Sequence, residues 1–178
     1  MLKSQNGHGE DRCLLRRDLF KTVSSQWPSG VAVVTAVDES GVPHGLTMSA
    51  VLALSLDPMQ YLISVDRNST TLPSIKSSSR FCINFLSKTQ VDVGRHFASK
   101  SANKFSLMSH RISDWGPPII PDAVSAIICH VSAVLPAGDH EMIVGDVLDM
   151  EHRGGEPLVY FNRGFYAVGP GHAAMERA

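Results

Sequence analysis

An acidic residue and a histidine stand side by side in the triplet Gly138-Asp139-His140. Apolar, strand-like segments flank the triplet on both sides, so we expect it to join the two strands of a hairpin. A turn requires only the glycine. The Asp139–His140 pair could therefore be a metal ligand, a catalytic dyad or a docking point for a ligand. The residues alone leave open a plain loop histidine that closes the hairpin.

Hydroxyl and amide side chains gather in two further segments. In "GLTMSA" (45–50), Thr47 and Ser49 would project from the same face of a strand. These hydroxyl groups could line a binding site, or they could simply form the polar, solvent-facing side of an edge strand. In "DRNSTTLPS" (66–74), polar side chains precede a short predicted helix with Pro73 in its first turn. Those side chains could be simple helix caps. They could also belong to an anion site, to which Arg67 and Lys104 would add positive charge.

The sequence lacks the motifs of several common enzyme classes. It contains no G-x-x-x-x-G-K-[ST], no G-x-G-x-x-G, no H-E-x-x-H and no G-x-S-x-G. These absences disfavour P-loop, Rossmann, zincin-type and α/β-hydrolase sites. The eight histidines show no metal-ligand spacing, and we predict no metal site. The three cysteines contain no C-x-x-C pair, and two of them, Cys82 and Cys129, lie in apolar runs and are expected to be buried thiols.

Length and composition indicate one globular domain. The chain has 178 residues, of which 43% are hydrophobic and 19% charged, and its net charge is -1. This size allows a substantial core, and the balanced charge disfavours nucleic-acid binding. No segment reaches the roughly 18 apolar residues of a membrane helix. The polar start "MLKSQNGHGEDR" lacks the apolar core of a signal peptide. We therefore expect a cytoplasmic protein that binds neither nucleic acid nor membrane.

Strands are the main elements that must position these residues. Apolar or alternating segments predict strands over 31–37, 46–56, 61–65, 80–86, 125–135 and 141–150, and a last hairpin over 157–168. The strand over 31–37 is apolar throughout and should be buried on both faces. Many strands with few helices predict a mainly β fold, either a barrel or a sandwich with peripheral helices.

Three helices are expected around these strands. Apolar residues at steps of four, from Leu15 to Trp27, predict an amphipathic helix over 14–27. A short helix is expected over 71–78 and another over 88–99, where Ser87 and Gln90 fit a capping box. Residues 1–12 and 170–178 are expected to be disordered, which leaves one domain over 13–169.

In their order along the chain, these segments resemble the flavin reductase family, which has an FMN-binding split-barrel fold. The family includes the short reductase components of two-component flavin monooxygenases. The matching segments are "WPSGVAVVTA" (27–36), "GLTMSA" (45–50), "LSLDP" (54–58), "FCINFLS" (81–87), "HFAS…KF" (96–105), "GDH" (138–140) and "PLVYFNRGFY" (157–166). They span about residues 18–168, and it is the ordered set that is specific.

The resemblance implies a homodimer of Greek-key split β-barrels with peripheral helices and a flavin near the dimer interface. The flavin would be FMN, with FAD as the alternative. Its isoalloxazine and ribityl chain would lie against Thr47, Met48, Ser49, Ala50 and Val51. Its phosphate side would be bracketed by Asp66, Arg67, Asn68, Ser69 and Thr70, with Lys104 and Phe105 completing the site. This sequence has Ala50 where a second serine is common in the family.

The resemblance also assigns the Gly138–His140 triplet to the nicotinamide nucleotide, NADH or alternatively NADPH. The expected activity is hydride transfer from the nicotinamide to the flavin. His140 would grip the carboxamide as a neutral donor or acceptor, and Asp139 would orient its ring. Reduced flavin would then diffuse to a monooxygenase. Two other classes compete: a flavin-binding or storage protein without reductase activity, and a pyridoxamine-phosphate-oxidase-like or haem-binding split barrel.

Overall fold

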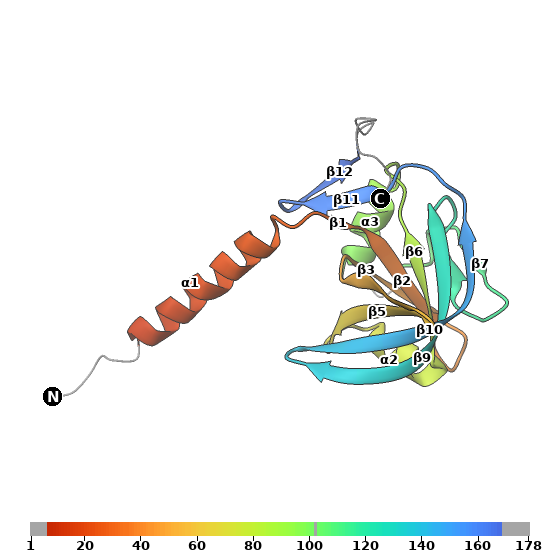
Figure 1. The fold of residues 1–178 in the computed structure, drawn as a ribbon, viewed down its shortest axis with the longest axis horizontal. Coiled ribbons are helices and arrows are strands. Elements are labelled where there is room, and N and C mark those ends of the chain that lie inside the picture. Colours follow the sequence, from red (N-terminus) through yellow and green to blue (C-terminus); the bar gives the residue numbers. More distant parts are fainter. Residues whose placement is uncertain (1–6, 102, 169–178) are drawn as a thin grey trace.

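A seven-stranded antiparallel sheet forms the body of the computed structural model, which describes residues 7–101 and 103–168 (Figure 1). Its strand order is β3-β2-β6-β9-β10-β5-β4. The strands are β2 (Ala32–Val37), β3 (Pro43–Met48), β4 (Val51–Leu56), β5 (Met59–Asp66), β6 (Arg80–Phe85), β9 (Ser125–Ala137) and β10 (His140–His152). The predicted mainly β architecture is confirmed.

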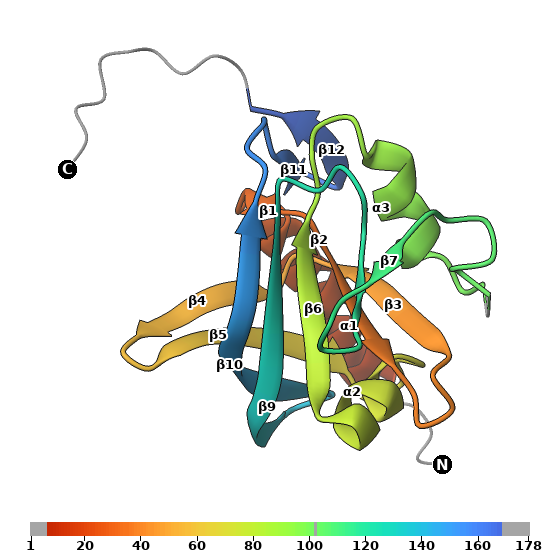
Figure 2. The ribbon, with the colours of Figure 1, turned by 90° about the vertical axis from the view of Figure 1, so that its right-hand side faces the viewer.

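The sheet curls into a barrel that is open between its two edge strands, β3 and β4 (Figure 2). These strands follow each other in the chain and are joined by Ser49 and Ala50. The prediction of one strand over 46–56 was therefore wrong. β3 pairs with β2 and β4 pairs with β5, so the chain must change sheet edge at residues 49–50.

Smaller sheets flank the barrel. β1 (Ser29–Gly30), β11 (Leu158–Phe161) and β12 (Gly164–Ala167) form one of them, and β7 (Arg111–Ile112) pairs with β8 (Pro118–Ile119) in another. The hairpin expected over 157–168 is confirmed by the pairing of β11 with β12. The strands β1, β7 and β8 have two residues each, too few for a periodic sequence signal.

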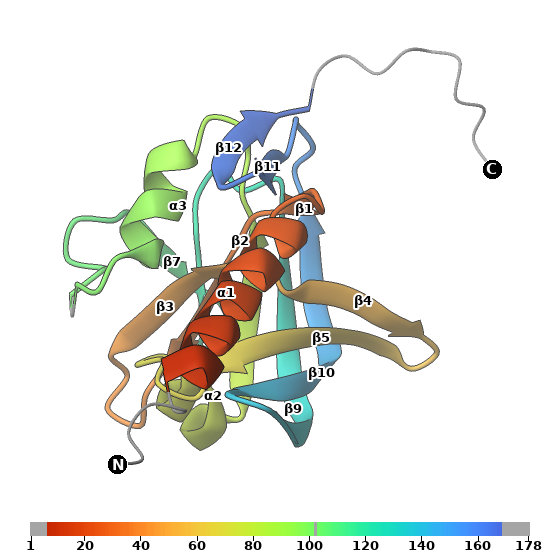
Figure 3. The same ribbon diagram turned by 90° about the vertical axis from the view of Figure 1, so that its left-hand side faces the viewer.

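The helix α1 (Gly7–Ser24) projects away from the barrel on the side where β3 and β4 separate (Figures 1 and 3). It begins inside the segment 1–12, so the expectation of disorder was wrong for residues 7–12. Residues 1–6 and 170–178 lie outside the described part of the chain. The helix ends three residues before Trp27, ahead of the predicted end. Its apolar side chains are exposed, among them Leu15, Leu19, Phe20 and Val23.

The other two helices are short and lie close to the predicted positions. α2 (Leu72–Ser78) closes one end of the barrel (Figure 2), and α3 (Val91–Ala98) contacts β3 and β2. Only half of the expected capping box forms: the Ser87 backbone N–H donates to Gln90 Oε1 at 3.0 Å. The Ser87 hydroxyl instead pairs with Thr89, and α3 begins after Gln90.

Two apolar clusters lie on opposite faces of β2. Ala32, Val34 and Ala36 belong to the cluster inside the barrel, whereas Val31 and Val33 pack in the cluster that contains Phe97 of α3. This confirms that β2 is buried on both faces. Leu72 and Ile75 of α2 complete the inner cluster, so this helix is held firmly against the barrel.

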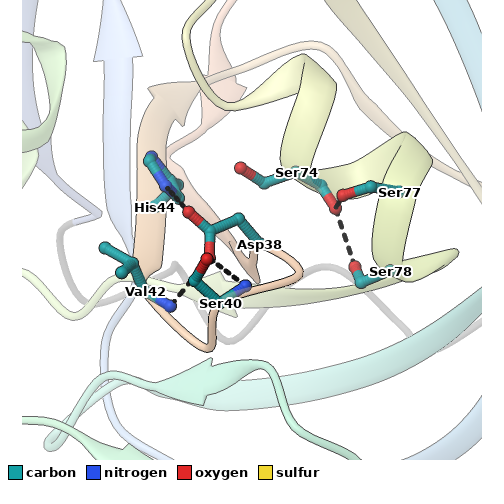
Figure 4. Close-up of polar contacts among 7 residues, drawn as sticks. All are labelled: Asp38, Ser40, Val42, His44, Ser74, Ser77 and Ser78. Atoms are coloured by element: carbon teal, nitrogen blue, oxygen red, sulfur yellow. Dashed lines mark hydrogen bonds and ion pairs between the residues drawn. The ribbon is translucent and has the colours of Figure 1, made fainter.

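The β2–β3 turn and the end of α2 lie close together (Figure 4). The Asp38 carboxylate accepts hydrogen bonds from the backbone N–H groups of Ser40 and Val42, and it pairs with His44 Nε2 at 3.1 Å. The bond from Val42, followed by that from His44, holds the pKa of the Asp38 carboxyl below its usual value. These contacts fix the turn.

Candidate functional site

The Gly138–His140 turn lies at the tip of the long β9–β10 hairpin. Ala137 is opposite His140, so Gly138 and Asp139 form a two-residue turn. Gly138 has φ +62°, the left-handed conformation that such turns place on glycine. The predicted hairpin is confirmed. Gly138 accounts for the geometry of the turn, but it does not account for the choice of Asp139 and His140 after it.

Asp139 and His140 are in direct contact. Asp139 Oδ1 lies 2.7 Å from His140 Nδ1, and this hydrogen bond holds the pKa of the Asp139 carboxyl below its ordinary value. In the neutral imidazole, the carboxylate favours the tautomer with the proton on Nδ1. Nε2 is then an acceptor that can receive a hydrogen bond from an amide N–H. The His140 side chain is 39% exposed, so a ligand can reach it.

The segment 66–70 lies directly beside this turn. Asp66 is opposite His140 in the β5–β10 pairing, and the Arg67 N–H donates to the Asp139 carbonyl at 3.1 Å. The segment is internally fixed because Asp66 Oδ1 accepts from Asn68 N at 2.8 Å. The structure thus brings together two predicted groups of site residues that are separated by about seventy positions in the sequence.

The segment 47–51 borders an open groove of about 860 Å³ at the split of the barrel. Ser49 and Val51 line this groove, and Thr47, Met48 and Ser49 line a smaller hollow beside it. The Thr47 hydroxyl donates to the Gly94 carbonyl at 2.6 Å, so it joins β3 to α3. Ser49 and Ala50 are exposed.

The strand β5 connects the groove to the Gly138–His140 turn. Its Tyr61 lines the groove, its Ser64 N–H donates to the Ala50 carbonyl at 3.1 Å, and its last residue is Asp66. Tyr61 and Asp66 face opposite sides of the strand because successive side chains alternate. β4 accompanies β5 only as far as Ile63. A ligand that reached from the groove to the Gly138–His140 turn would therefore pass around β5 beyond Ile63, where β4 no longer pairs with it.

Lys104 and Phe105 have other roles in the structure. The Lys104 ammonium donates to the carbonyls of Gly45 at 3.1 Å and Phe97 at 2.8 Å, which uses two of its three donors. Burial lowers the pKa of this ammonium. The Phe105 ring is buried at 8% exposure, 5.0 Å from the ring of Phe97. The Phe105 ring thus packs in the apolar cluster that contains Phe97, and its predicted contact with the flavin stays a prediction.

Other groove residues were missed by the sequence reasoning. Trp27, Tyr160 and Arg163 line the groove together with Lys21 and Phe20 of α1. The only signal was indirect, since Trp27, Tyr160 and Arg163 lie inside matching segments of the family. The β11–β12 turn is held to the residue that directly follows α1, because the Asn162 N–H donates to the Ser25 carbonyl at 2.7 Å.

Within residues 7–101 and 103–168, no three or more His, Cys, Asp or Glu side chains are grouped to hold a metal ion. No helix in that part of the chain has the length and hydropathy to cross a membrane. The buried thiols expected at Cys82 and Cys129 are confirmed.

Comparison with known proteins gives one consistent result. The family model described as "Flavin reductase like domain" matches residues 24–169. A flavin reductase of Pseudomonas putida is 38% identical over 147 residues, which are 83% of this chain and 86% of the relative. The FMN reductase (NADH) SmoA of Agrobacterium fabrum is 34% identical and aligns over 82% of this chain and 83% of its own. The crystal structure of nitrilotriacetate monooxygenase component B from Mycobacterium thermoresistibile superimposes with a TM-score of 0.86 at 32% identity. That superposition covers 92% of this chain and 94% of the other.

Proposed function

Because the chain belongs to the flavin reductase-like domain family, we propose that it transfers hydride from NADH to a flavin and supplies the reduced flavin to a partner monooxygenase. The observation that carries the proposal is the contact between the Gly138–His140 turn and the segment 66–70. NADH is preferred over NADPH because the SmoA relative is an NADH-dependent FMN reductase. FMN is preferred over FAD on the same ground.

The groove fits a flavin in size and lining. Its volume of about 860 Å³ lies within the range of cofactor sites. Tyr61, Phe85 and Tyr160 supply aromatic surface, and Ser29 and Ser49 supply hydroxyl groups. When bound, the flavin supplies the hydride acceptor for the nicotinamide C4 hydride.

The residues of this chain would hold, orient and shield the two reactants. Ser49, Ala50 and Val51 would line the ring system at the split of the barrel, and the segment 66–70 would lie toward the phosphate. His140 Nε2 would accept a hydrogen bond from the carboxamide N–H of the nicotinamide, while Asp139 keeps the proton on Nδ1. No general base is needed for a hydride transfer, so the contribution of His140 is positional.

A homodimer is part of this proposal, and the apolar side of α1 supports it. Leu15 is 71% exposed, and Leu19 and Val23 are each 62% exposed; their steps of four place them on one side of the helix. Most of the stability of a helix in a protein comes from the packing of its apolar side, and a second copy of the chain would cover this side of α1. The substitution Leu19→Glu should then shift the protein from dimer to monomer in sedimentation equilibrium. A monomeric wild-type protein would contradict the dimer.

The domain over 13–169 and a cytoplasmic location also remain proposals. The location is supported by the free thiols of Cys82 and Cys129 in the described part of the chain, since reduced cysteines are typical of reducing compartments. The flavin-binding protein without reductase activity is the competing class.

Steady-state oxidation of NADH tests the function, with FMN, FAD and riboflavin as acceptors and NADPH as the alternative donor. We expect rapid oxidation of NADH with FMN and slower oxidation of NADPH. Absence of turnover with every pair of donor and acceptor would remove the proposed function. Faster turnover with NADPH or FAD would correct only the cofactor preference.

A further inference from the structure

Lys76 and Glu141 form an ion pair beside the Gly138–His140 turn. The Lys76 Nζ lies 3.0 Å and 3.3 Å from the two carboxylate oxygens of Glu141. The Glu141 side chain is only 18% exposed, whereas that of Lys76 is 49% exposed. Glu141 directly follows His140 at the start of β10. The ion pair therefore ties the first residues of β10 to α2.

The helix that carries Lys76 is itself fixed to the barrel. Ile75, the neighbour of Lys76, is fully buried in the inner cluster, and so is most of Leu72. The segment 66–70 precedes the start of the same helix, and its Arg67 N–H already contacts Asp139. The helix α2 thus follows the segment 66–70, which is expected to lie beside the flavin phosphate, and it also carries Lys76, the cation that pairs with Glu141.

The geometry of β10 means that the position of Glu141 helps to fix the position of the His140 ring. Glu141 is opposite the buried Val65 and His140 is opposite the exposed Asp66, so the two side chains leave opposite faces of β10. Glu141 is drawn to α2 while the His140 ring points to the other side. Any shift of the Glu141 backbone must move the His140 ring, which shares the adjacent peptide bond.

We propose that Lys76 and Glu141 are positioning residues for the nicotinamide step, because their ion pair sets the place of the His140 ring relative to the segment 66–70. This inference rests on the proposed function. It adds two residues that lie outside the predicted site and that need not touch either reactant.

The test uses the full chain and the variants Lys76→Met, Glu141→Gln, Lys76→Arg and the charge swap Lys76→Glu/Glu141→Lys. The single neutral variants should raise KM for NADH about two- to fivefold, the range expected for a partly exposed ion pair. FMN affinity should stay within about twofold of wild type. Lys76→Arg should keep the wild-type KM because a guanidinium can make the same contact. The charge swap should bring KM for NADH most of the way back to the wild-type value.

The pair Lys88–Glu156 supplies the matched control. Its atoms are 2.8 Å apart and its side chains are 45% and 53% exposed, but Lys88 follows β6 and Glu156 precedes β11. Lys88→Met should leave KM for NADH unchanged. Thermal unfolding of each variant separates a general loss of stability from the specific change in KM.

The outcomes distinguish the two levels of the proposal. If His140→Ala keeps the wild-type kcat/KM for NADH, the assignment of the turn to the nicotinamide fails, and the positioning role fails with it. If His140→Ala lowers kcat/KM but Lys76→Met and Glu141→Gln leave KM for NADH unchanged, only the positioning role is overturned. The positioning role is also overturned by an equal effect in Lys88→Met, or by a charge swap that performs no better than the single variants.

Discussion

Replacement of His140 by alanine should separate nicotinamide use from flavin binding. Nδ1 of His140 is already occupied by Asp139 at 2.7 Å, so the ring has one remaining nitrogen for a ligand. One neutral hydrogen bond contributes about 1 kcal/mol, or about a fivefold change in affinity. Looser positioning of a reactant by about 1 Å can cost a further factor of about 100 in rate.

These two contributions set the expected size of the effect. We expect kcat/KM for NADH to fall in His140→Ala by at least about fivefold, from the lost hydrogen bond, and by up to about 500-fold if positioning is lost as well. FMN affinity should change by less than about twofold, because His140 is expected to contact the nicotinamide and not the flavin. His140→Asn should recover part of the activity, since an amide can also bond a carboxamide.

The assay is steady-state NADH oxidation at saturating FMN, combined with a fluorescence titration of FMN binding. His44→Ala is the control, because His44 also pairs with an aspartate, Asp38 at 3.1 Å, in another hairpin turn (Figure 4). The reasoning is refuted if His140→Ala keeps the wild-type kcat/KM, or if His44→Ala loses as much.

Three further predictions follow from packing and burial. In Gly145→Ala, the new Cβ would lie 2.5 Å from Phe81 Cζ, so thermal unfolding should show a loss of about 1–3 kcal/mol. Gly30→Ala, whose Cβ meets nothing within 4 Å, should be nearly neutral. Burial raises the pKa of Cys129 to about 12 from an ordinary value near 9. The stability that this thiol contributes should therefore be present below pH 9 and fall by about 1.4 kcal/mol per pH unit above it; Cys129→Ala should have a shallower alkaline decline in denaturant unfolding. For the same reason, Cys82 should resist alkylation in the folded protein and react after unfolding, and rapid labelling of native protein would contradict its burial.

The sequence predicted most of the sheet because the strands carry strong apolar patterns. The strand over 125–135 is an example: Ile127, Cys129 and Val131 were expected to share a face, and all three belong to or pack against the inner cluster. The division at Ser49–Ala50 could not be predicted, because both halves of 46–56 are equally strand-like. Only the pairing of each half with a different edge separates them.

In the candidate site, too, contacts between distant segments could not be predicted from local sequence patterns. The contact between Arg67 and Asp139 joins segments about seventy residues apart, and no local pattern reports such a contact. The packing of the Phe105 ring against Phe97 of α3 was likewise not visible in the "KF" pair, which carries no signal of its tertiary neighbours. The exposed apolar side of α1 was not expected either, because periodicity predicts an apolar stripe and not what covers it.

The most direct test of the proposed function is anaerobic mixing of the purified protein and FMN with NADH, followed by the visible spectrum. The proposed reductase activity predicts that the flavin bands bleach rapidly, and that His140→Ala slows the bleaching without changing the spectrum of the bound flavin. Flavin bands that persist in the wild-type protein after addition of NADH would contradict the proposal and indicate a flavin-binding protein. A Soret band in the purified protein would contradict both and indicate a haem-binding relative.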